Sequence, residues 1–244
     1  MRNIRLIIEY DGTKYAGWQI QKNALAIQEV IEGSIEKITG EDVEVIGSSR
    51  TDAGVHAIGY TANFKTNSSV PPEKFADALN TKLPRDVVIL SSVEVPLKFH
   101  SRYDSLGKSY CYTVINRLEP PAIGRNYTYH MKFKLNVDNM RKATKYFLGT
   151  HDFSALKNMG SKTQTSIRTI TDLRIDHQGD VIKIYCSADG FLYNMMRIIT
   201  GVLLQVGTGR FKPEEVEAII LSKDRKRAGK SVPPSGLCLM EVFY

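Results

Sequence analysis

The sequence has few cysteines and no cysteine pairing motif. Only three of its 244 residues are cysteines, Cys111, Cys186 and Cys238, and no two of them form a C-x-x-C pair. An odd number of widely separated cysteines argues against a disulfide framework and against a cysteine zinc site. Each lies in a strand-like run, so we expect buried free thiols in a reducing compartment.

Long hydrophobic runs are also missing. No stretch approaches the roughly eighteen consecutive apolar residues of a membrane-spanning helix. The N-terminal segment, MRNIRLIIEYDG, is interrupted by Arg5 and Glu9 and lacks the apolar centre of a signal peptide. We therefore expect a cytoplasmic protein without a membrane anchor.

Acidic residues are fewer than basic ones. The sequence has 26 Asp and Glu residues and 33 Lys and Arg residues, which gives a net charge of +7. This balance favours polyanionic partners, although many ordinary cytoplasmic proteins share it. The cations are unevenly spread. Residues 222–230, SKDRKRAGK, carry five of them, and Lys98, Arg102 and Lys108 surround one predicted turn. Such a run is either a solvated face or a nucleic-acid contact.

The apolar fraction of 42% supports a packed core, and the first 104 residues predict an α+β domain. Their hydrophobic periodicity predicts strands at 4–10, 42–47, 56–66 and 86–95 and helices at 24–40 and 71–81. The resulting order, βαββαβ, is that of a ferredoxin-like unit.

Residues 105–244 repeat this order loosely. We predict a strand at 109–116, a helix at 137–149, a hairpin at 168–188, helices at 191–207 and 213–222, and a last strand at 236–244. Segment 150–167 fits no element and is long for a plain connection, so we predict a functional role for it. The expected domains are two ferredoxin-like halves, 1–104 and 105–244.

This element order alone does not define a function. RNA-binding domains of the RRM type share it, and a non-catalytic RRM-like RNA-binding protein is one hypothesis. Such domains carry an aromatic-rich third strand with a Lys/Arg-Gly-Phe pattern. Strand 56–66, HAIGYTANFKT, lacks that pattern.

Residues 47–60, GSSRTDAGVHAIGY, contain more ionisable groups than a turn between two strands requires. Asp52-Ala53-Gly54 alone is typical of a turn, in which Asp bonds its own backbone and Gly supplies positive φ. Turn formation requires neither Arg50 nor His56. This loop is therefore a candidate functional site.

Arg197 lies in FLYNMMRIITGVLLQVG, a predicted helix that is apolar around most of its surface and hence largely buried. A buried guanidinium is costly unless a carboxylate faces it, whereas one near a helix end can extend to water. The nearest acids in sequence, Asp189 and Glu214, are poorly placed. Asp52 is a candidate partner that would be held ionised and oriented.

Tyr110 and Tyr112 alternate along strand 109–116 and so point to the same face. Strand tyrosines usually serve packing, and the functional alternative is a stacking platform for a nucleobase. Leu237, in SGLCLMEV, is by default a core residue.

Together these segments resemble a known family. RTDAGVHA is similar to the active-site motif of the tRNA pseudouridine synthase A family, which acts on the anticodon arm. The other segments that resemble the family are, in order, EYDGTKYAGWQIQ, FHSRYDSLGKSYCYTV, GTHDFSAL, FLYNMMRIITGVLLQVGTG and GLCLMEVFY. The similarity runs along almost the whole chain, and on this basis the chain is identified as a member of that family.

The resemblance implies that the chain isomerises uridine to pseudouridine at positions 38, 39 and 40 of tRNA, without cofactor or metal. It implies the pseudouridine synthase fold, an α+β arrangement of two ferredoxin-like halves joined in one mixed, mainly antiparallel sheet with helices on one face. It also implies a homodimer with basic clefts.

The resemblance assigns roles to five residues. Asp52 is the catalytic carboxylate, and Arg50 contacts RNA and helps to hold the base out. Tyr110 stacks on the target base, Arg197 pairs with the catalytic Asp, and Leu237 forms a wall of the pocket.

The chemistry fits these residue types. The reaction breaks the bond from ribose C1′ to N1, rotates the uracil and joins C1′ to C5. A carboxylate, which is ionised above its unperturbed pKa of about 3.9, has three options: attack on C1′, removal of the 2′ proton, or addition to C6. A paired base must first be flipped out, at roughly a few kcal/mol, which phosphate contacts offset. His56 either contacts RNA or shapes the turn.

Overall fold

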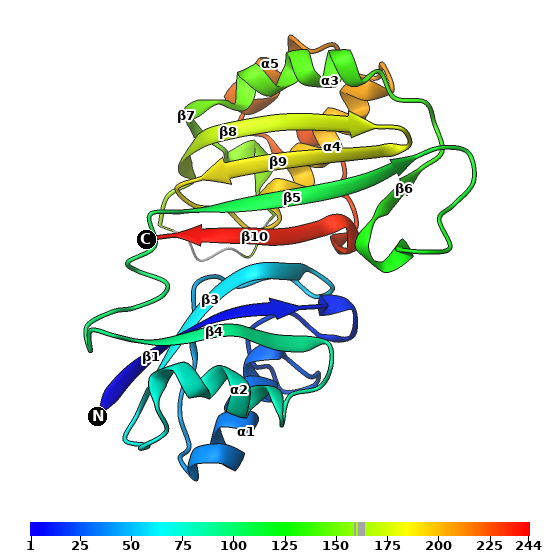
Figure 1. Cartoon of the computed structure of the whole chain (residues 1–244). Helices are drawn as coiled ribbons and strands as arrows, with labels where there is room; N and C mark the ends of the chain where they lie inside the picture. The colour runs from blue at the N-terminus through cyan, green and yellow to red at the C-terminus, as the bar shows by residue number, and fades with distance from the viewer. Residues whose placement is uncertain (159, 161–163) are drawn as a thin grey trace. The chain divides into compact units, whose positions relative to one another are not determined.

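The computed structural model describes residues 1–158, 160 and 164–244. Contacts divide the chain into two compact units, one of Met1–Leu106 with Cys238–Tyr244 and one of Gly107–Leu237. Each unit combines a sheet with helices (Figure 1). The predicted α+β class, with mixed and mainly antiparallel strands, is confirmed. The last strand follows the second unit in sequence but groups with the first.

The sheet of the first unit has the order β4-β1-β3-β10. Its strands are β1 (Arg2–Tyr10), β3 (His56–Thr66), β4 (Val87–Val95) and β10 (Leu237–Phe243). Strand β1 is antiparallel to β3 and β4, whereas β10 runs parallel to β3. Alternation along β1 buries Ile4, Leu6 and Ile8 completely.

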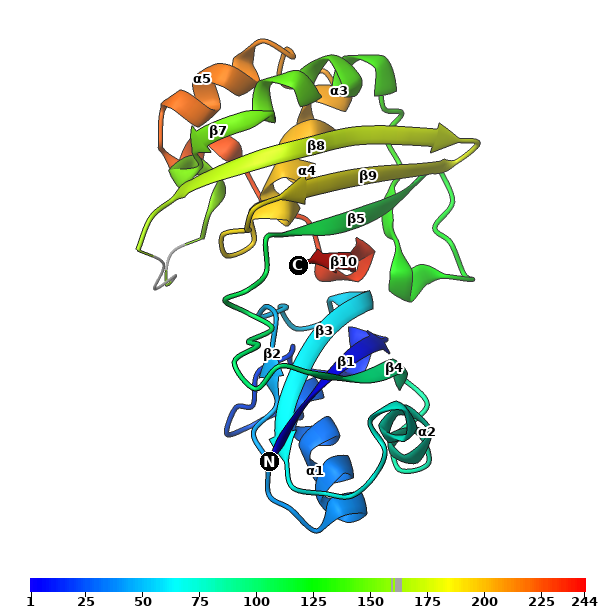
Figure 2. The same ribbon diagram turned by 60° about the vertical axis from the view of Figure 1, so that its left-hand side comes forward.

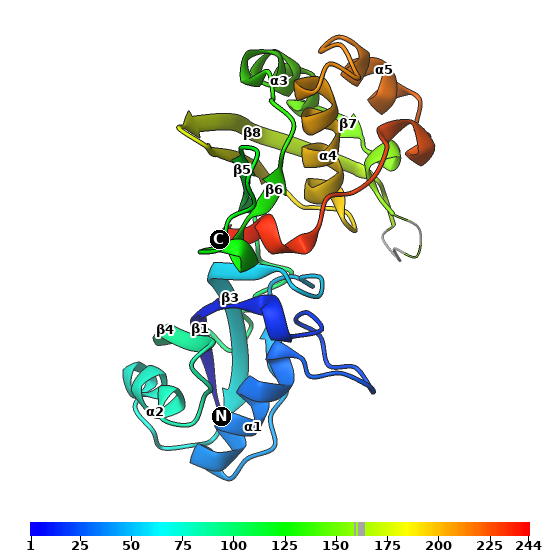
Figure 3. The same ribbon diagram turned by 90° about the vertical axis from the view of Figure 1, so that its right-hand side faces the viewer.

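Helices α1 (Ile27–Thr39) and α2 (Phe75–Asn80) lie on the same side of this sheet (Figure 3). Ile27, Ile31 and Ile35 recur at every fourth position of α1, and all three are fully buried. Gly40 ends α1 with φ 72°, and its N–H donates to the carbonyl of Glu36. The helix predicted at 24–40 is thus confirmed from Ile27 to Thr39.

The strand predicted at 42–47 is reduced to β2 (Ile46–Gly47), so most of that prediction was wrong. Backbone N–H groups that a longer strand would use for ladder hydrogen bonds donate to glutamate side chains instead. The Val45 N–H donates to Glu32 Oε1 at 2.8 Å, and the Asn67 N–H, just beyond β3, donates to Glu41 Oε1 at 3.0 Å. These hydrogen bonds depend on tertiary contacts that local alternation does not reveal.

The sheet of the second unit has the order β5-β9-β8-β7, and β6 pairs with β5 in parallel. Its strands are β5 (Gly107–Asn116), β6 (Tyr129–Met131), β7 (Gly149–Asp152), β8 (Ile167–Gln178) and β9 (Val181–Ala188). Helices α3 (Val137–Thr144), α4 (Met195–Gly207) and α5 (Glu215–Leu221) lie on one side of it (Figure 2). In the described part of the chain, no helix is long and apolar enough to cross a membrane.

Two predictions for the second unit were wrong in part. Helix α4 begins at Met195 rather than at 191, because Asn194 adopts the left-handed conformation, with φ 61°. Segment 150–167 was expected to lack regular structure, but it contributes to β7 and to a 3-10 turn at Ser154–Leu156. These pieces are too short for a periodic signal. Residues 159 and 161–163 of that segment lie outside the described residues.

Candidate active site

Asp52 lies in the loop between β2 and β3, at the start of a tight turn. Its carbonyl accepts a hydrogen bond from the Val55 N–H at 3.1 Å, and Gly54 takes positive φ, 76°. The turn predicted from Asp-Ala-Gly is therefore present. Asp52 itself is half-buried and Arg50 is exposed.

Thr51, the residue before Asp52, is buried and held through both its side chain and its backbone. Its Oγ1 is hydrogen-bonded to the Tyr10 hydroxyl at 2.8 Å, and its carbonyl accepts from the Trp18 N–H at 3.2 Å. These two contacts fix the N-terminal side of the turn to the end of β1 and to the segment that follows it.

An aromatic cluster supports the beginning of the loop. Trp18 and Tyr60 stack with their ring centroids 4.0 Å apart, and Tyr10 packs against Tyr60 at 5.7 Å. The Tyr60 hydroxyl donates to the carbonyl of Ser49 and lies 3.3 Å from the Ser49 N–H, which donates to it. The beginning of the loop is thus held by a buried aromatic cluster.

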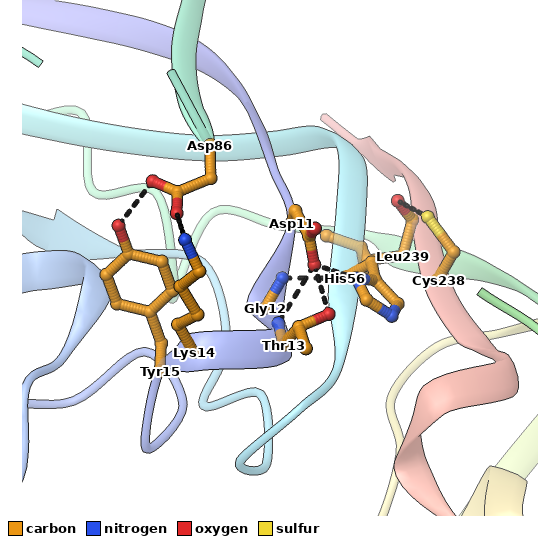
Figure 4. Close-up of polar contacts among 9 residues, drawn as sticks. All are labelled: Asp11, Gly12, Thr13, Lys14, Tyr15, His56, Asp86, Cys238 and Leu239. Atoms are coloured by element: carbon orange, nitrogen blue, oxygen red, sulfur yellow. Dashed lines mark hydrogen bonds and ion pairs between the residues drawn. The ribbon is translucent and has the colours of Figure 1, made fainter. Parts of the chain in front are cut away.

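Tyr15 fixes the other side of the turn. Its carbonyl accepts from the Gly54 N–H at 3.3 Å, and its hydroxyl donates to Asp86 Oδ1 at 2.6 Å (Figure 4). Burial, with the Asp86 hydrogen bond, raises the pKa of Tyr15 well above its ordinary value. The phenol therefore stays a donor at neutral pH, and residues 11–18 connect Asp86 to the loop.

Two glycines allow the backbone of residues 11–18 to approach the loop. A Cβ on Gly12 would lie 2.0 Å from the carbonyl oxygen of Val55, and one on Gly17 would lie 2.4 Å from that of Thr51. Gly17 also has φ 96°, which favours glycine. No larger residue fits at either position without moving the loop.

His56, which immediately follows the loop, is 5% exposed and faces the same segment. Its Nδ1 lies 3.1 Å from Asp11 Oδ1 and 3.1 Å from the backbone nitrogen of Gly12 (Figure 4). The sequence left the role of His56 open between RNA contact and turn shaping. The structure gives it two partners within the protein.

In the second unit, Tyr110 and Tyr112 share one face of β5, as predicted. Tyr110 is buried, and its ring meets Phe191 edge-on at 4.8 Å. The Tyr112 hydroxyl donates to the Pro233 carbonyl at 2.7 Å, and burial raises the pKa of Tyr112. Tyr112 is thus a packing residue. Tyr110 keeps 7% of its surface exposed, whereas Tyr112 is fully buried.

Arg197 is half-buried on α4, and it binds the segment that leads to Leu237. Its Nε donates to the Val232 carbonyl at 2.8 Å, its guanidinium donates to the Asn194 side chain, and its own carbonyl accepts from the Val232 N–H at 3.2 Å. Leu237 follows and is buried at the start of β10. The pairing of Arg197 with Asp52 involves both units and stays a prediction.

The basic run 222–230 contains residues of different kinds. Arg225 is half-buried, donates to Asn158 Oδ1 at 2.9 Å and to the Gly229 carbonyl, and has its pKa lowered by burial. Lys223 Nζ lies 2.9 Å from Asp152 Oδ2. The remaining cations, Lys226, Arg227 and Lys230, are exposed.

The sequence pattern did not indicate roles for Tyr10, Tyr15 or Trp18. The available signal was the density of aromatic residues and glycines in EYDGTKYAGWQ, residues 9–19. Within the ranges that the structure describes, no group of three or more His, Cys, Asp or Glu side chains is arranged to hold a metal ion.

Comparisons with known proteins agree with the resemblance seen in the sequence. A family model described as tRNA pseudouridine synthase matches residues 6–104 and 143–244. The chain is 59% identical to tRNA pseudouridine synthase A 2 of Clostridium perfringens over 244 residues, which cover all of both chains. It is 55% identical to tRNA pseudouridine synthase A of Clostridium acetobutylicum and 52% identical to that of Acetivibrio thermocellus, again over 244 residues and all of both chains.

The close approach at Gly17 predicts a strong effect of one methyl group. Gly17→Ala and Gly40→Ala both place alanine at positive φ, but a Cβ at position 40 has no atom within 4 Å. We expect Gly40→Ala to lower the free energy of unfolding by about 1 kcal/mol, and Gly17→Ala to lower it by a further ~1–3 kcal/mol. Urea unfolding of the two variants measures both losses, and equal losses would contradict the close approach.

Proposed function

The chain belongs to the tRNA pseudouridine synthase family, and we propose that it isomerises uridine to pseudouridine in tRNA with Asp52 as the catalytic carboxylate. One observation carries the choice of Asp52. Its turn is anchored at Thr51 on one side and at Gly54 on the other, while the side chain itself remains half-exposed. Anchoring of this kind orients a reacting group in advance. The comparisons give no support to a non-catalytic RRM-like protein.

The reaction needs a fixed negative charge and a pocket that retains the base. Uridine loses its bond from C1′ to N1, the uracil turns, and C1′ joins C5; C5 then releases a proton to the solvent, and N1 takes one up. Atoms are rearranged with no net oxidation or reduction. A single carboxylate suffices whether it attacks C1′, removes the 2′ proton or adds to C6. This chemistry supports the proposal that no cofactor takes part.

The second unit supplies the groups proposed to hold the substrate. Tyr110 is proposed to stack on the target base, supported by its fixed, edge-on packing against Phe191. Leu237 is proposed to form an apolar wall. Arg197 is proposed to pair with Asp52, supported by a guanidinium that Val232 and Asn194 already orient.

Finer properties of the proposal rest on the family resemblance. We place the modified uridines at positions 38, 39 and 40 of tRNA, the protein in the cytoplasm, and the active form as a homodimer. The net charge of +7 supports an RNA partner.

Removal of the charge at position 52 tests the catalytic assignment. Asp52→Asn keeps the shape of the turn, so we expect tRNA affinity to stay nearly constant while turnover falls by more than about 10³-fold. Release of hydrogen from tRNA labelled at C5 of uridine measures turnover directly. Asp42→Asn, at an exposed position, is the matched control. Substantial release by Asp52→Asn would refute the assignment.

The structure separates the cations of run 222–230 into two groups with different expected effects. Lys226→Ala combined with Arg227→Ala should weaken tRNA binding and reduce the salt slope of log K by about one unit per lost phosphate contact. Arg225→Ala should instead lower thermal stability, because Arg225 binds Asn158 and Gly229. Binding titrations at several salt concentrations, with thermal unfolding, distinguish the two. A salt slope that the double substitution leaves unchanged would show that these residues do not contact RNA.

Arg50 is proposed to hold the target nucleotide outside the helix. We expect Arg50→Ala to lower kcat more than tRNA affinity, because base flipping follows binding. Arg85→Ala, another exposed arginine of the first unit, serves as the control in single-turnover and binding assays. Equal losses of turnover and affinity in Arg50→Ala would give Arg50 only a general role in RNA binding.

A further inference from the structure

His56 is a buried ionisable residue to which the proposed reaction assigns no role. It begins β3 directly after Val55, whose N–H closes the turn of Asp52. At 5% exposure its ring is nearly enclosed. A buried histidine beside a reacting carboxylate is either a participant in proton transfer, a positioning group or a packing residue.

Two contacts of His56 involve its ring nitrogen Nδ1. Nδ1 lies 3.1 Å from Asp11 Oδ1 and 3.1 Å from the Gly12 nitrogen. An unprotonated Nδ1 accepts the Gly12 N–H, and a protonated Nδ1 donates to the Asp11 carboxylate. These two partners are consecutive residues of one turn. His56 therefore keeps a hydrogen bond to the same backbone segment in either protonation state.

That segment is itself fixed, so it is a suitable anchor. The Asp11 N–H donates to the Asp86 carbonyl at 2.9 Å, and Asp11 Oδ1 accepts from the Thr13 N–H at 2.9 Å. Gly12 lies against the carbonyl of Val55. The end of the Asp52 turn is thus held against a turn that the rest of the first unit already positions (Figure 4).

We infer that His56 is a positioning residue for the Asp52 turn, acting through Nδ1 and not as a proton donor or acceptor in the reaction. The inference rests on the proposed function, in which Asp52 is the reacting carboxylate. The His56 hydrogen bond adds a side-chain contact on the C-terminal side of the turn to the backbone hydrogen bond from Gly54 to Tyr15. A misplacement of about 1 Å at a reacting group is enough to reduce turnover ~10²-fold.

Two amide substitutions separate the roles of the two ring nitrogens. His56→Asn places an amide near the position of Nδ1, where it can accept from Gly12 or donate to Asp11. His56→Gln carries the same amide one carbon farther, near the position of Nε2. We expect kcat of His56→Asn to stay within about fivefold of the unchanged protein and that of His56→Gln to fall ~10²-fold, with KM for tRNA similar in both.

The comparison is internally controlled, because both variants are polar and uncharged. A kcat of His56→Asn at least about tenfold above that of His56→Gln, at similar KM, supports positioning through Nδ1. Equal values of kcat in the two variants overturn it, whether both are impaired, as proton transfer would require, or both are active, as simple packing would allow. Circular dichroism confirms that each variant is folded.

Asp52→Asn, assayed on the same tRNA, separates this inference from the proposed function. If Asp52→Asn is inactive while the two His56 variants are equal, only the role of His56 is wrong. If Asp52→Asn remains active, the proposed function fails, and the inference about His56, which rests on it, fails as well.

Discussion

The structure of the site depends on one close approach of two backbone segments, residues 11–18 and the loop before β3. Gly12 and Gly17 bring this segment so near to the carbonyl oxygens of Val55 and Thr51 that no side chain fits between them. Hydrogen bonds from Trp18 and to Tyr15 then cross the contact. Because both sides of the turn are anchored, the backbone that carries the Asp52 carboxylate is fixed before the reaction.

The two units supply different things to the proposed chemistry. The first unit supplies a carboxylate on an anchored turn. The packed rings of Trp18, Tyr60 and Tyr10 support the beginning of the loop that contains this turn. The second supplies a packed tyrosine, Tyr110, and an oriented guanidinium, Arg197. An isomerisation transfers no group to a second substrate, so charge, orientation and exclusion of water are what the protein must provide. The exposed cations of run 222–230 are proposed to add affinity for a polyanion.

The sequence predicted those features that depend on local pattern. Strand β3 has the predicted bounds, helix α1 lies within its predicted range, and Asp-Ala-Gly forms a turn. Prediction from the sequence failed where contacts between residues distant in the chain determine the local structure. Glu32 and Glu41 occupy groups that would have extended β2, and Arg225 is bound to Asn158. The partners of His56 lie more than forty positions away, and no periodicity indicates such a contact.

The most direct test of the account is a crystal structure of the Asp52→Asn protein bound to a tRNA anticodon stem-loop. The account predicts an unstacked uridine whose C1′, C2′ or C6 lies about 3–3.5 Å from the side chain at position 52, with the loop still held at Thr51 and Gly54. A bound uridine with another carboxylate at its sugar, and with position 52 facing away, would contradict it.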